Sequence, residues 1–240
     1  MAGHHTVQTV VFSTDTLYDS RGPVGFSSTK TTLSRLQSFK PDAIMPLQIL
    51  KANKKNLRTA SKILKQGGVV VYPTDTAYAL GGVFHSKKAA QKILQIKGRT
   101  DTKFTLIASS LYQVEKFFHL NAIQKRLAKK YWPAALSLVV SKSFAVRVPN
   151  NAVARSLAKS ARSPLIATSA NVTSQTTPYS VEEVKRQYRG KKFVPDLILD
   201  SGRLAKIKTS TIVEVKKNKI RVLRQGSVDV SSAVKNYSRS

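Results

Sequence analysis

From Leu47 onward the chain alternates between segments with helical periodicity and short apolar segments that suit β-strands. Apolar residues recur at helical spacing over residues 57–64, and Gly67-Gly68 separates them from the apolar run at 69–72. The same alternation continues to residue 223. Because interleaved helices and strands pack as layers, the pattern predicts an α/β fold.

Local signals place the other elements. Ser86 and Asn121 are suited to cap helices that end at Gly98 and before Trp132-Pro133. The sequence Ser180-Val181-Glu182-Glu183 has the pattern of a capping box that opens another helix. Strands are predicted at residues 136–140, 144–148, 165–167, 197–199, 212–215 and 220–223, the last two joined by a turn at 216–219.

Length and composition favour one main domain. With 240 residues and 41% hydrophobic content, the chain can bury one sizeable core. We expect this main domain at residues 45–230, a poorly ordered N-terminal extension at 1–44 and a short tail at 231–240. A targeting sequence, or translated sequence upstream of a start at Met45, remains an alternative for residues 1–44. No apolar stretch approaches the ~20 residues of a membrane span, and we therefore expect a soluble, cytoplasmic protein.

The chain is strongly basic. Its 41 Lys and Arg residues against 12 Asp and Glu give a formal net charge of +29. Such a field attracts polyanions, which favours a nucleotide or RNA partner. The alternative is a lysine-rich composition without a nucleic-acid role.

Four short polar segments lie next to apolar runs. They are Pro73–Tyr78, Lys97–Arg99, Thr168–Asn171 and Ser210–Val213. Because polar groups at strand and helix ends can converge on a ligand, together they predict a binding site. Taken singly, each segment also fits a β-turn, a helix cap or a solvated basic cluster.

The residue types in these segments suit a nucleotide and a small polar acid. Lys97, Arg99 and Lys103 lie within seven residues, and Arg224 follows the last strand. Fixed cations stabilise the negative charge that builds on phosphate oxygens during displacement at phosphorus. Uncharged hydroxyl and amide groups near Ser169 suit ribose hydroxyls, a phosphate oxygen or a carbonyl.

Several other chemistries are disfavoured. The chain has no cysteine, which excludes disulfides, thiolate nucleophiles and cysteine-ligated zinc. His85 and His119 have no acidic residues at metal-ligand spacing, so we expect no tightly bound protein metal site. Neither a Gly-x-Ser-x-Gly nor a Gly-x-Gly-x-x-Gly motif is present.

In this order the segments resemble the YrdC family of threonylcarbamoyl-AMP synthases, from about Leu47 to Val228. The sequence PTDTAYALGG at 73–82 resembles the family's PTDTVYGLG, and WPAALSLV at 132–139 resembles WPGPLTLV. Residues 146–149 resemble VRVP, and residues 223–226 resemble LRPG. Lys97, Arg99, Ser169 and Asn171 fall on the family's Lys-x-Arg and Ser-x-Asn signature, while Lys103-Phe104 stands where the family has Lys-Pro.

The resemblance implies a twisted mixed sheet flanked by helices, with a basic concave cleft. It also implies synthesis of L-threonylcarbamoyladenylate and pyrophosphate from L-threonine, bicarbonate and ATP. A partner transferase complex then moves the threonylcarbamoyl group to tRNA, and direct contact with tRNA or double-stranded RNA is a further expectation. Magnesium would enter with ATP, held mainly by the triphosphate.

The resemblance also assigns residues. Threonine would be held by Thr76, Arg147 and Ser210, with the guanidinium facing the threonine carboxylate. The ATP or adenylate site would be lined by Lys97, Arg99, Lys103, Ser143, Ser169, Asn171, Thr177 and Arg224. Of these, the expected catalytic set is Lys97, Arg99, Ser169 and Asn171. No general base is assigned, because positioning and charge neutralisation suffice for carbamate and adenylate formation.

Two other functions remain open from the sequence. A non-catalytic RNA-binding or ribosome-associated protein of the same fold would use the net charge rather than a pocket. A carbamoyltransferase that uses carbamoyl-adenylate is a third reading, because YrdC-like domains also occur in such enzymes.

Overall fold

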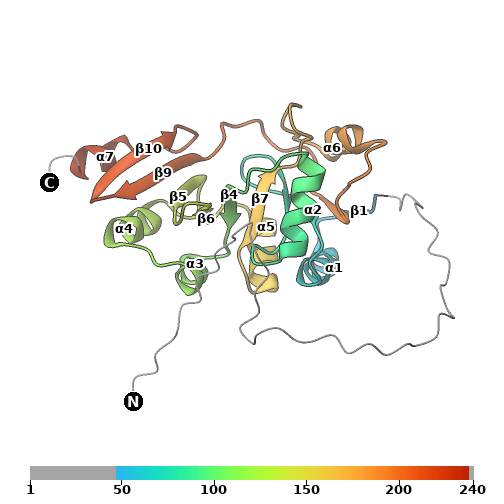
Figure 1. Ribbon diagram of the computed structural model, residues 1–240, viewed down its shortest axis with the longest axis horizontal. Coiled ribbons are helices and arrows are strands. Elements are labelled where there is room, and N and C mark those ends of the chain that lie inside the picture. The colour runs from blue at the N-terminus through green and yellow to red at the C-terminus, as the bar shows by residue number, and fades with distance from the viewer. Residues whose placement is uncertain (1–46, 238–240) are drawn as a thin grey trace, which may run out of the picture. The chain divides into compact units, whose positions relative to one another are not determined.

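The computed structural model describes residues 47–237, which are built around a mixed β-sheet. Among these residues the sheet has ten strands in the order β1-β8-β2-β3-β7-β4-β6-β5-β9-β10 (Figure 1). The strands are β1 (Ile49–Lys51), β2 (Val70–Pro73), β3 (Tyr78–Gly81), β4 (Phe104–Ile107), β5 (Leu136–Val139), β6 (Phe144–Arg147), β7 (Leu165–Ser169), β8 (Leu197–Asp200), β9 (Thr211–Lys216) and β10 (Lys219–Arg224). The expected twisted mixed sheet flanked by helices is confirmed.

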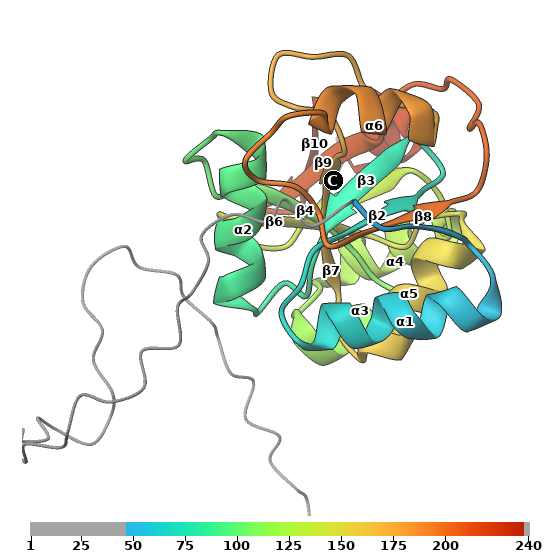
Figure 2. The ribbon, with the colours of Figure 1, turned by 90° about the vertical axis from the view of Figure 1, so that its right-hand side faces the viewer.

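Helices cover both faces of the sheet (Figure 2). They are α1 (Lys54–Lys65), α2 (Lys87–Lys97), α3 (Leu111–Phe117), α4 (Ala122–Tyr131), α5 (Ala152–Ala161), α6 (Val181–Tyr188) and α7 (Ser231–Tyr237). Helices α2, α3 and α6 share one buried cluster, and α1 and α5 share a second. A third cluster joins α4 and α7 to strands β5, β9 and β10.

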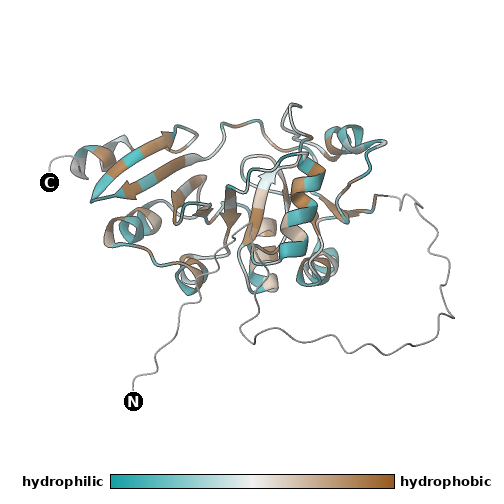
Figure 3. Cartoon of the chain, viewed as in Figure 1, coloured by the Kyte–Doolittle hydropathy of each residue, from teal (hydrophilic) through white to brown (hydrophobic). Residues whose placement is uncertain are grey.

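The apolar run around β2 shows why the sheet needs helices on both sides. Val69 and Val71 pack with the α2 cluster, whereas Val70 and Tyr72 pack with the α1 and α5 cluster. Successive strand side chains point to opposite faces, so an uninterrupted apolar run requires two covered faces. In Figure 3 the strands of the central sheet are mainly hydrophobic, whereas the helices carry both hydrophilic and hydrophobic stretches.

Strand β7 joins the two halves of the sheet. Leu165 to Ala167 pair antiparallel with β4, whereas Thr168 and Ser169 pair antiparallel with β3. One strand therefore brings segments far apart in the sequence to the same place, including the Ser169 end of β7 and the Lys103 end of β4.

Most predicted caps and strands are confirmed. Ser86 and Asn121 cap α2 and α4, and Gly98 ends α2 with a left-handed φ of 58°. The capping box at α6 differs in one bond, because the Glu183 carboxylate accepts from the Tyr179 N–H at 2.7 Å instead of the Ser180 N–H. The predicted turn between β9 and β10 is present, with positive φ at Lys217.

Other elements were not predicted. The sequence pattern gave no element for β1, β3, β4, α3 or α5. The segment expected as a C-terminal tail contains α7, whose Ala233 is buried in the third cluster. The expected N-terminal extension at 1–44 lies outside the described residues. Over residues 47–237, no helix has the length and apolar character needed to cross a membrane.

Candidate active site

A cavity of about 580 Å³ lies over one face of the sheet. Its floor is a row of small side chains in register across three strands, with Thr105 of β4 opposite Ala145 of β6 and Ala167 of β7. These three residues are called the cavity floor below. Because larger side chains at these positions would fill the space, their small size is what leaves room for a ligand.

The lining of the cavity is positively charged. Among its lining residues are five cationic side chains and one carboxylate, that of Glu214. The cations are Arg99, Lys103, Lys142, Arg147 and Arg224. A concave surface with this balance favours an anionic ligand.

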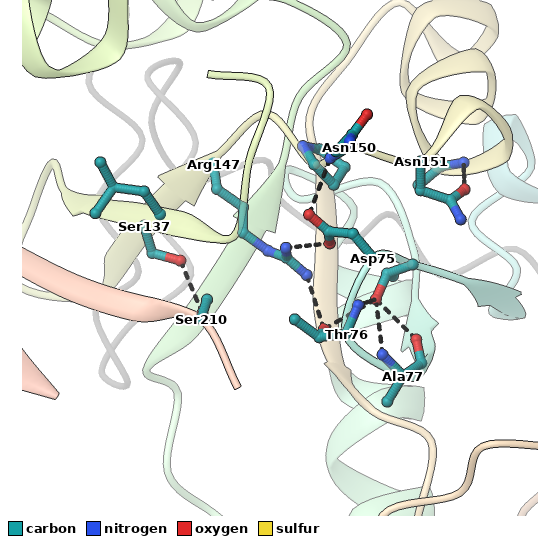
Figure 4. Close-up of polar contacts among 12 residues, drawn as sticks. Asp75, Thr76, Ala77, Ser137, Arg147, Asn150, Asn151 and Ser210 are labelled. Carbon is teal, nitrogen blue, oxygen red and sulfur yellow. Dashed lines mark hydrogen bonds and ion pairs between the residues drawn. The ribbon is translucent and has the colours of Figure 1, made fainter. Parts of the chain in front are cut away.

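Arg147 is held by the segment that follows β2 (Figure 4). Its Nη1 forms an ion pair with the Asp75 carboxylate, and its Nη2 donates to the Thr76 hydroxyl at 3.2 Å. The other Asp75 oxygen accepts from the Asn150 N–H at 2.9 Å. The Arg147 side chain is only 5% exposed, so these contacts fix its guanidinium at the cavity wall.

A second guanidinium group, that of Arg224, also lines the cavity. Arg224 donates from Nε to the Ser210 carbonyl at 3.0 Å and from Nη2 to the Ser210 hydroxyl at 2.9 Å. The Ser210 hydroxyl also lies 3.2 Å from that of Ser137 (Figure 4). Burial, and then the charge of Arg147, lowers the pKa of Arg224. An anion bound between Arg147 and Arg224 would relieve this repulsion.

Gly226, at the end of the segment that resembles LRPG, packs closely against the backbone on both sides of Ser210. A Cβ at Gly226 would lie 2.0 Å from the Thr209 carbonyl oxygen and 2.5 Å from the Thr211 nitrogen. We therefore expect Gly226→Ala to lower the free energy of unfolding by about 2–3 kcal/mol, measured by thermal or denaturant unfolding. The adjacent, exposed Ser227→Ala is the matched control. Equal stability of both variants would contradict this prediction.

Arg99 lies against an aromatic ring. Its guanidinium carbon is 5.3 Å from the centroid of Phe104, and both residues line the cavity. Arg99 Nε is buried without a hydrogen-bond partner among the described residues. Phe104, which replaces the proline of the resembling pattern, therefore provides a cation–π contact that orients Arg99.

Lys97 and Asn171 lie outside the set of residues that line the cavity. Lys97 is 4% exposed, and its ammonium donates to the Ser169 carbonyl, the Asn171 carbonyl and the Asn171 Oδ1 at 3.0, 2.6 and 3.0 Å. Burial, and to a smaller extent the charge of Arg99, lowers the pKa of Lys97 to about 8. Lys97 and Asn171, which were predicted to line the ATP site, are therefore not among the residues that line this cavity.

The other predicted site residues come together. Nine line the cavity, namely Thr76, Arg99, Lys103, Ser143, Arg147, Ser169, Thr177, Ser210 and Arg224. Lys142, Tyr179 and Glu214 also line it and were not predicted. For Glu214 a signal was available, because Ile212 and Glu214 alternate along β9, in step with Ser210 just before the strand, and all three line the cavity.

Comparison with known proteins identifies the family. A family model named Sua5/YciO/YrdC and described as telomere recombination matches residues 62–226. The chain belongs to the Sua5/YciO/YrdC family. The resemblance seen in the sequence is thereby confirmed.

The chain is also similar to individual relatives and solved structures that carry the family's names. The threonylcarbamoyl-AMP synthase of Psychromonas ingrahamii is 32% identical over 170 residues, 64% of this chain and 88% of the relative. The uncharacterized protein YciO of Escherichia coli is 30% identical over 190 residues, 72% of this chain and 90% of YciO. The Pyrococcus abyssi Sua5 structure with L-threonine has a TM-score of 0.69 and 26% identity, and the match covers 78% of this chain and 59% of that one.

Proposed function

We propose that this chain is an L-threonylcarbamoyladenylate synthase that supplies a tRNA-modifying transferase complex. The threonine amine and bicarbonate form a carbamate and release water. A carbamate oxygen then attacks the α-phosphorus of ATP, and pyrophosphate leaves. The support is the family, the relative named threonylcarbamoyl-AMP synthase and the Sua5 structure with L-threonine.

One observation carries the proposal furthest. The Arg147 guanidinium with the Thr76 hydroxyl, and the Arg224 guanidinium with the Ser210 hydroxyl, both line the cavity, and the Arg147 charge contributes to lowering the pKa of Arg224. Two guanidiniums beside two hydroxyls suit the carboxylate and hydroxyl of threonine. At about 580 Å³ the cavity also falls in the range of small-molecule sites, with space left for a nucleotide.

We assign the phosphate contacts mainly to the cavity cations that are not assigned to threonine. Arg99 and Lys103 would face phosphate oxygens, with Arg224 between the carboxylate and the adenylate phosphate. Ser143, Ser169 and Thr177 would face uncharged parts of the nucleotide. The rate enhancement would come from positioning the carbamate beside the α-phosphorus and from stabilising charge on phosphate oxygens.

Magnesium would arrive with ATP in this proposal. Glu214 is the one carboxylate among the residues that line the cavity, and residues 47–237 hold no group of three or more His, Cys, Asp or Glu suited to a metal ion. A chain with this donor set would leave Mg²⁺ mainly on the triphosphate oxygens. The ion would neutralise part of the charge on the leaving pyrophosphate.

The decisive experiment is a pyrophosphate assay on the purified full chain with ATP, Mg²⁺, bicarbonate and labelled threonine. We expect pyrophosphate release that requires threonine, and a labelled adenylate product in equal amount. Omission of threonine is the control. Release that does not depend on threonine, or no release together with RNA binding that weakens steeply with salt, would contradict the proposal and favour the RNA-binding alternative.

A further inference from the structure

The ammonium group of Lys97 has no donor left for a ligand. A lysine ammonium carries three N–H groups. In Lys97 these donate to three oxygens at and just after the end of β7, those of the Ser169 carbonyl, the Asn171 carbonyl and the Asn171 side chain. With 4% exposure, the ammonium is covered by protein.

The Asn171 side chain is equally saturated. Its Nδ2 donates to the Val172 carbonyl at 3.0 Å and to the Gln175 carbonyl at 2.7 Å. Its Oδ1 accepts from Lys97 and from the Ser169 hydroxyl. An amide oxygen offers two lone pairs and an amide nitrogen two N–H groups, so all four are used.

The same bonds fix the segment that contributes Ser169 and Thr177 to the cavity. The Thr173 hydroxyl donates to the Lys97 carbonyl, which joins the turn to the end of α2. Gln187 of α6 accepts from the Val172 N–H and donates to the Thr176 carbonyl, both at 2.9 Å. We call residues 169–177 the β7 exit turn.

We propose that Lys97 and Asn171 are positioning residues: they hold the β7 exit turn in shape and make no contact with the nucleotide, leaving Arg99 as the phosphate-binding cation of the Lys-x-Arg pair. Naming ATP as the ligand rests on the proposed function. Gly98 allows Lys97 and Arg99 to have different environments. Its left-handed backbone ends α2 between the two residues, so that Lys97 is buried and Arg99 lines the cavity.

A consequence concerns Ser169. Its hydroxyl hydrogen is donated to Asn171 Oδ1, which can only accept. The hydroxyl therefore presents lone pairs to the cavity and suits a ligand donor such as a ribose hydroxyl. It does not suit an unprotonated phosphate oxygen.

The test compares how variants bind ATP and adenosine, which differ by the triphosphate. We expect Lys97→Met to lower the affinities for ATP and for adenosine by the same factor, roughly tenfold, because the β7 exit turn would contact both ligands and would lose its hydrogen bonds to Lys97. Arg99→Met should weaken ATP at least ~10-fold more than adenosine, because it removes a phosphate contact. Lys87→Met, an exposed lysine at the start of the same helix, is the control for loss of one charge. Affinities are measured by calorimetry on the full chain.

A second measurement does not depend on nucleotide binding. Amide hydrogen exchange in the ligand-free protein should increase at residues 169–177 in Lys97→Met and stay unchanged in Lys87→Met. Thr173→Val removes one bond of the network without changing charge, and should give a smaller loss that is again equal for ATP and adenosine. This variant serves if Lys97→Met fails to fold.

The outcomes separate the two hypotheses. If Lys97→Met lowers the affinity for ATP but not for adenosine, and amide hydrogen exchange in the β7 exit turn is unchanged, the positioning role is overturned. Lys97 would then be assigned to a phosphate contact. If the wild-type chain binds neither ligand, the proposed function fails. Increased exchange at 169–177 would then still support the positioning role, and unchanged exchange would overturn it.

Discussion

Replacing Arg147 with lysine should raise the threonine concentration needed for half-maximal pyrophosphate release by about 100-fold, with the ATP dependence nearly unchanged. Lysine keeps the positive charge and can still pair with Asp75, but it lacks the planar fork that contacts Asp75, Thr76 and a carboxylate together. The measurement is a threonine titration at saturating ATP, with a matching ATP titration at saturating threonine.

Substitution of Arg147 by lysine separates a binding effect from a stability effect better than substitution by alanine. Alanine would leave the Asp75 carboxylate, 10% exposed, without its partner. Loss of one partner of a buried ion pair costs about 3–5 kcal/mol of folding free energy, which would confuse a binding effect with unfolding.

Arg155→Lys is the matched control for Arg147→Lys. Arg155 lies in the nearby α5, donates to the Pro149 carbonyl at 2.7 Å and is not among the residues that line the cavity. We expect near-wild-type threonine dependence for this variant. A rise in the ATP requirement of Arg147→Lys, with threonine dependence unchanged, would instead assign Arg147 to a phosphate.

Filling the cavity floor should abolish nucleotide use without unfolding the chain. In Ala145→Phe the ring would extend from β6 over the floor, where Thr105 and Val139 are the cross-strand neighbours of Ala145. A ligand that lies there would be displaced. We expect ATP affinity to fall by about 100-fold or more, which corresponds to at least ~2.7 kcal/mol.

Calorimetry with ATP and thermal unfolding together check the cavity-floor variant. The ring projects into the cavity rather than into the packed core, so the melting temperature should stay close to that of wild type. Ala122→Phe, at an exposed position of α4 away from the cavity lining, is the control and should bind ATP normally. Unimpaired ATP binding by Ala145→Phe would show that the ligand does not lie on the floor.

The sequence predicted the features that depend on near neighbours. Ser86 and Asn121 were recognised as caps because a cap bonds to a backbone N–H three residues away. The β9–β10 turn was recognised because it joins two strands that are adjacent in the sequence, Lys216 pairing with Lys219. Strand β4 was not, because its four residues Phe104–Ile107 are stabilised by pairing with β6 and β7, which come much later in the chain.

The motif residues were found from the sequence, but their roles were only partly assigned. Lys97 and Arg99 are two residues apart and have the same charge, and both fall on the family signature, so the sequence assigned both to the nucleotide. Their difference in burial comes from the end of α2 and from a turn more than 70 residues away. Phe104, a departure from the family pattern, gained a role only when its ring was found beside Arg99.

By itself the sequence determined the α/β class, most helices and strands, the excess of positive charge and a set of candidate site residues, nine of which line the cavity. It did so because hydrophobic periodicity, caps and turns are set within a few residues. Only the tertiary structure decided which of those side chains line the cavity and which, like Lys97, are buried beside it. It also decided that Asp75 pairs with Arg147. These relations join residues about 70 positions apart, and strand register and helix packing across the whole sheet set their distances.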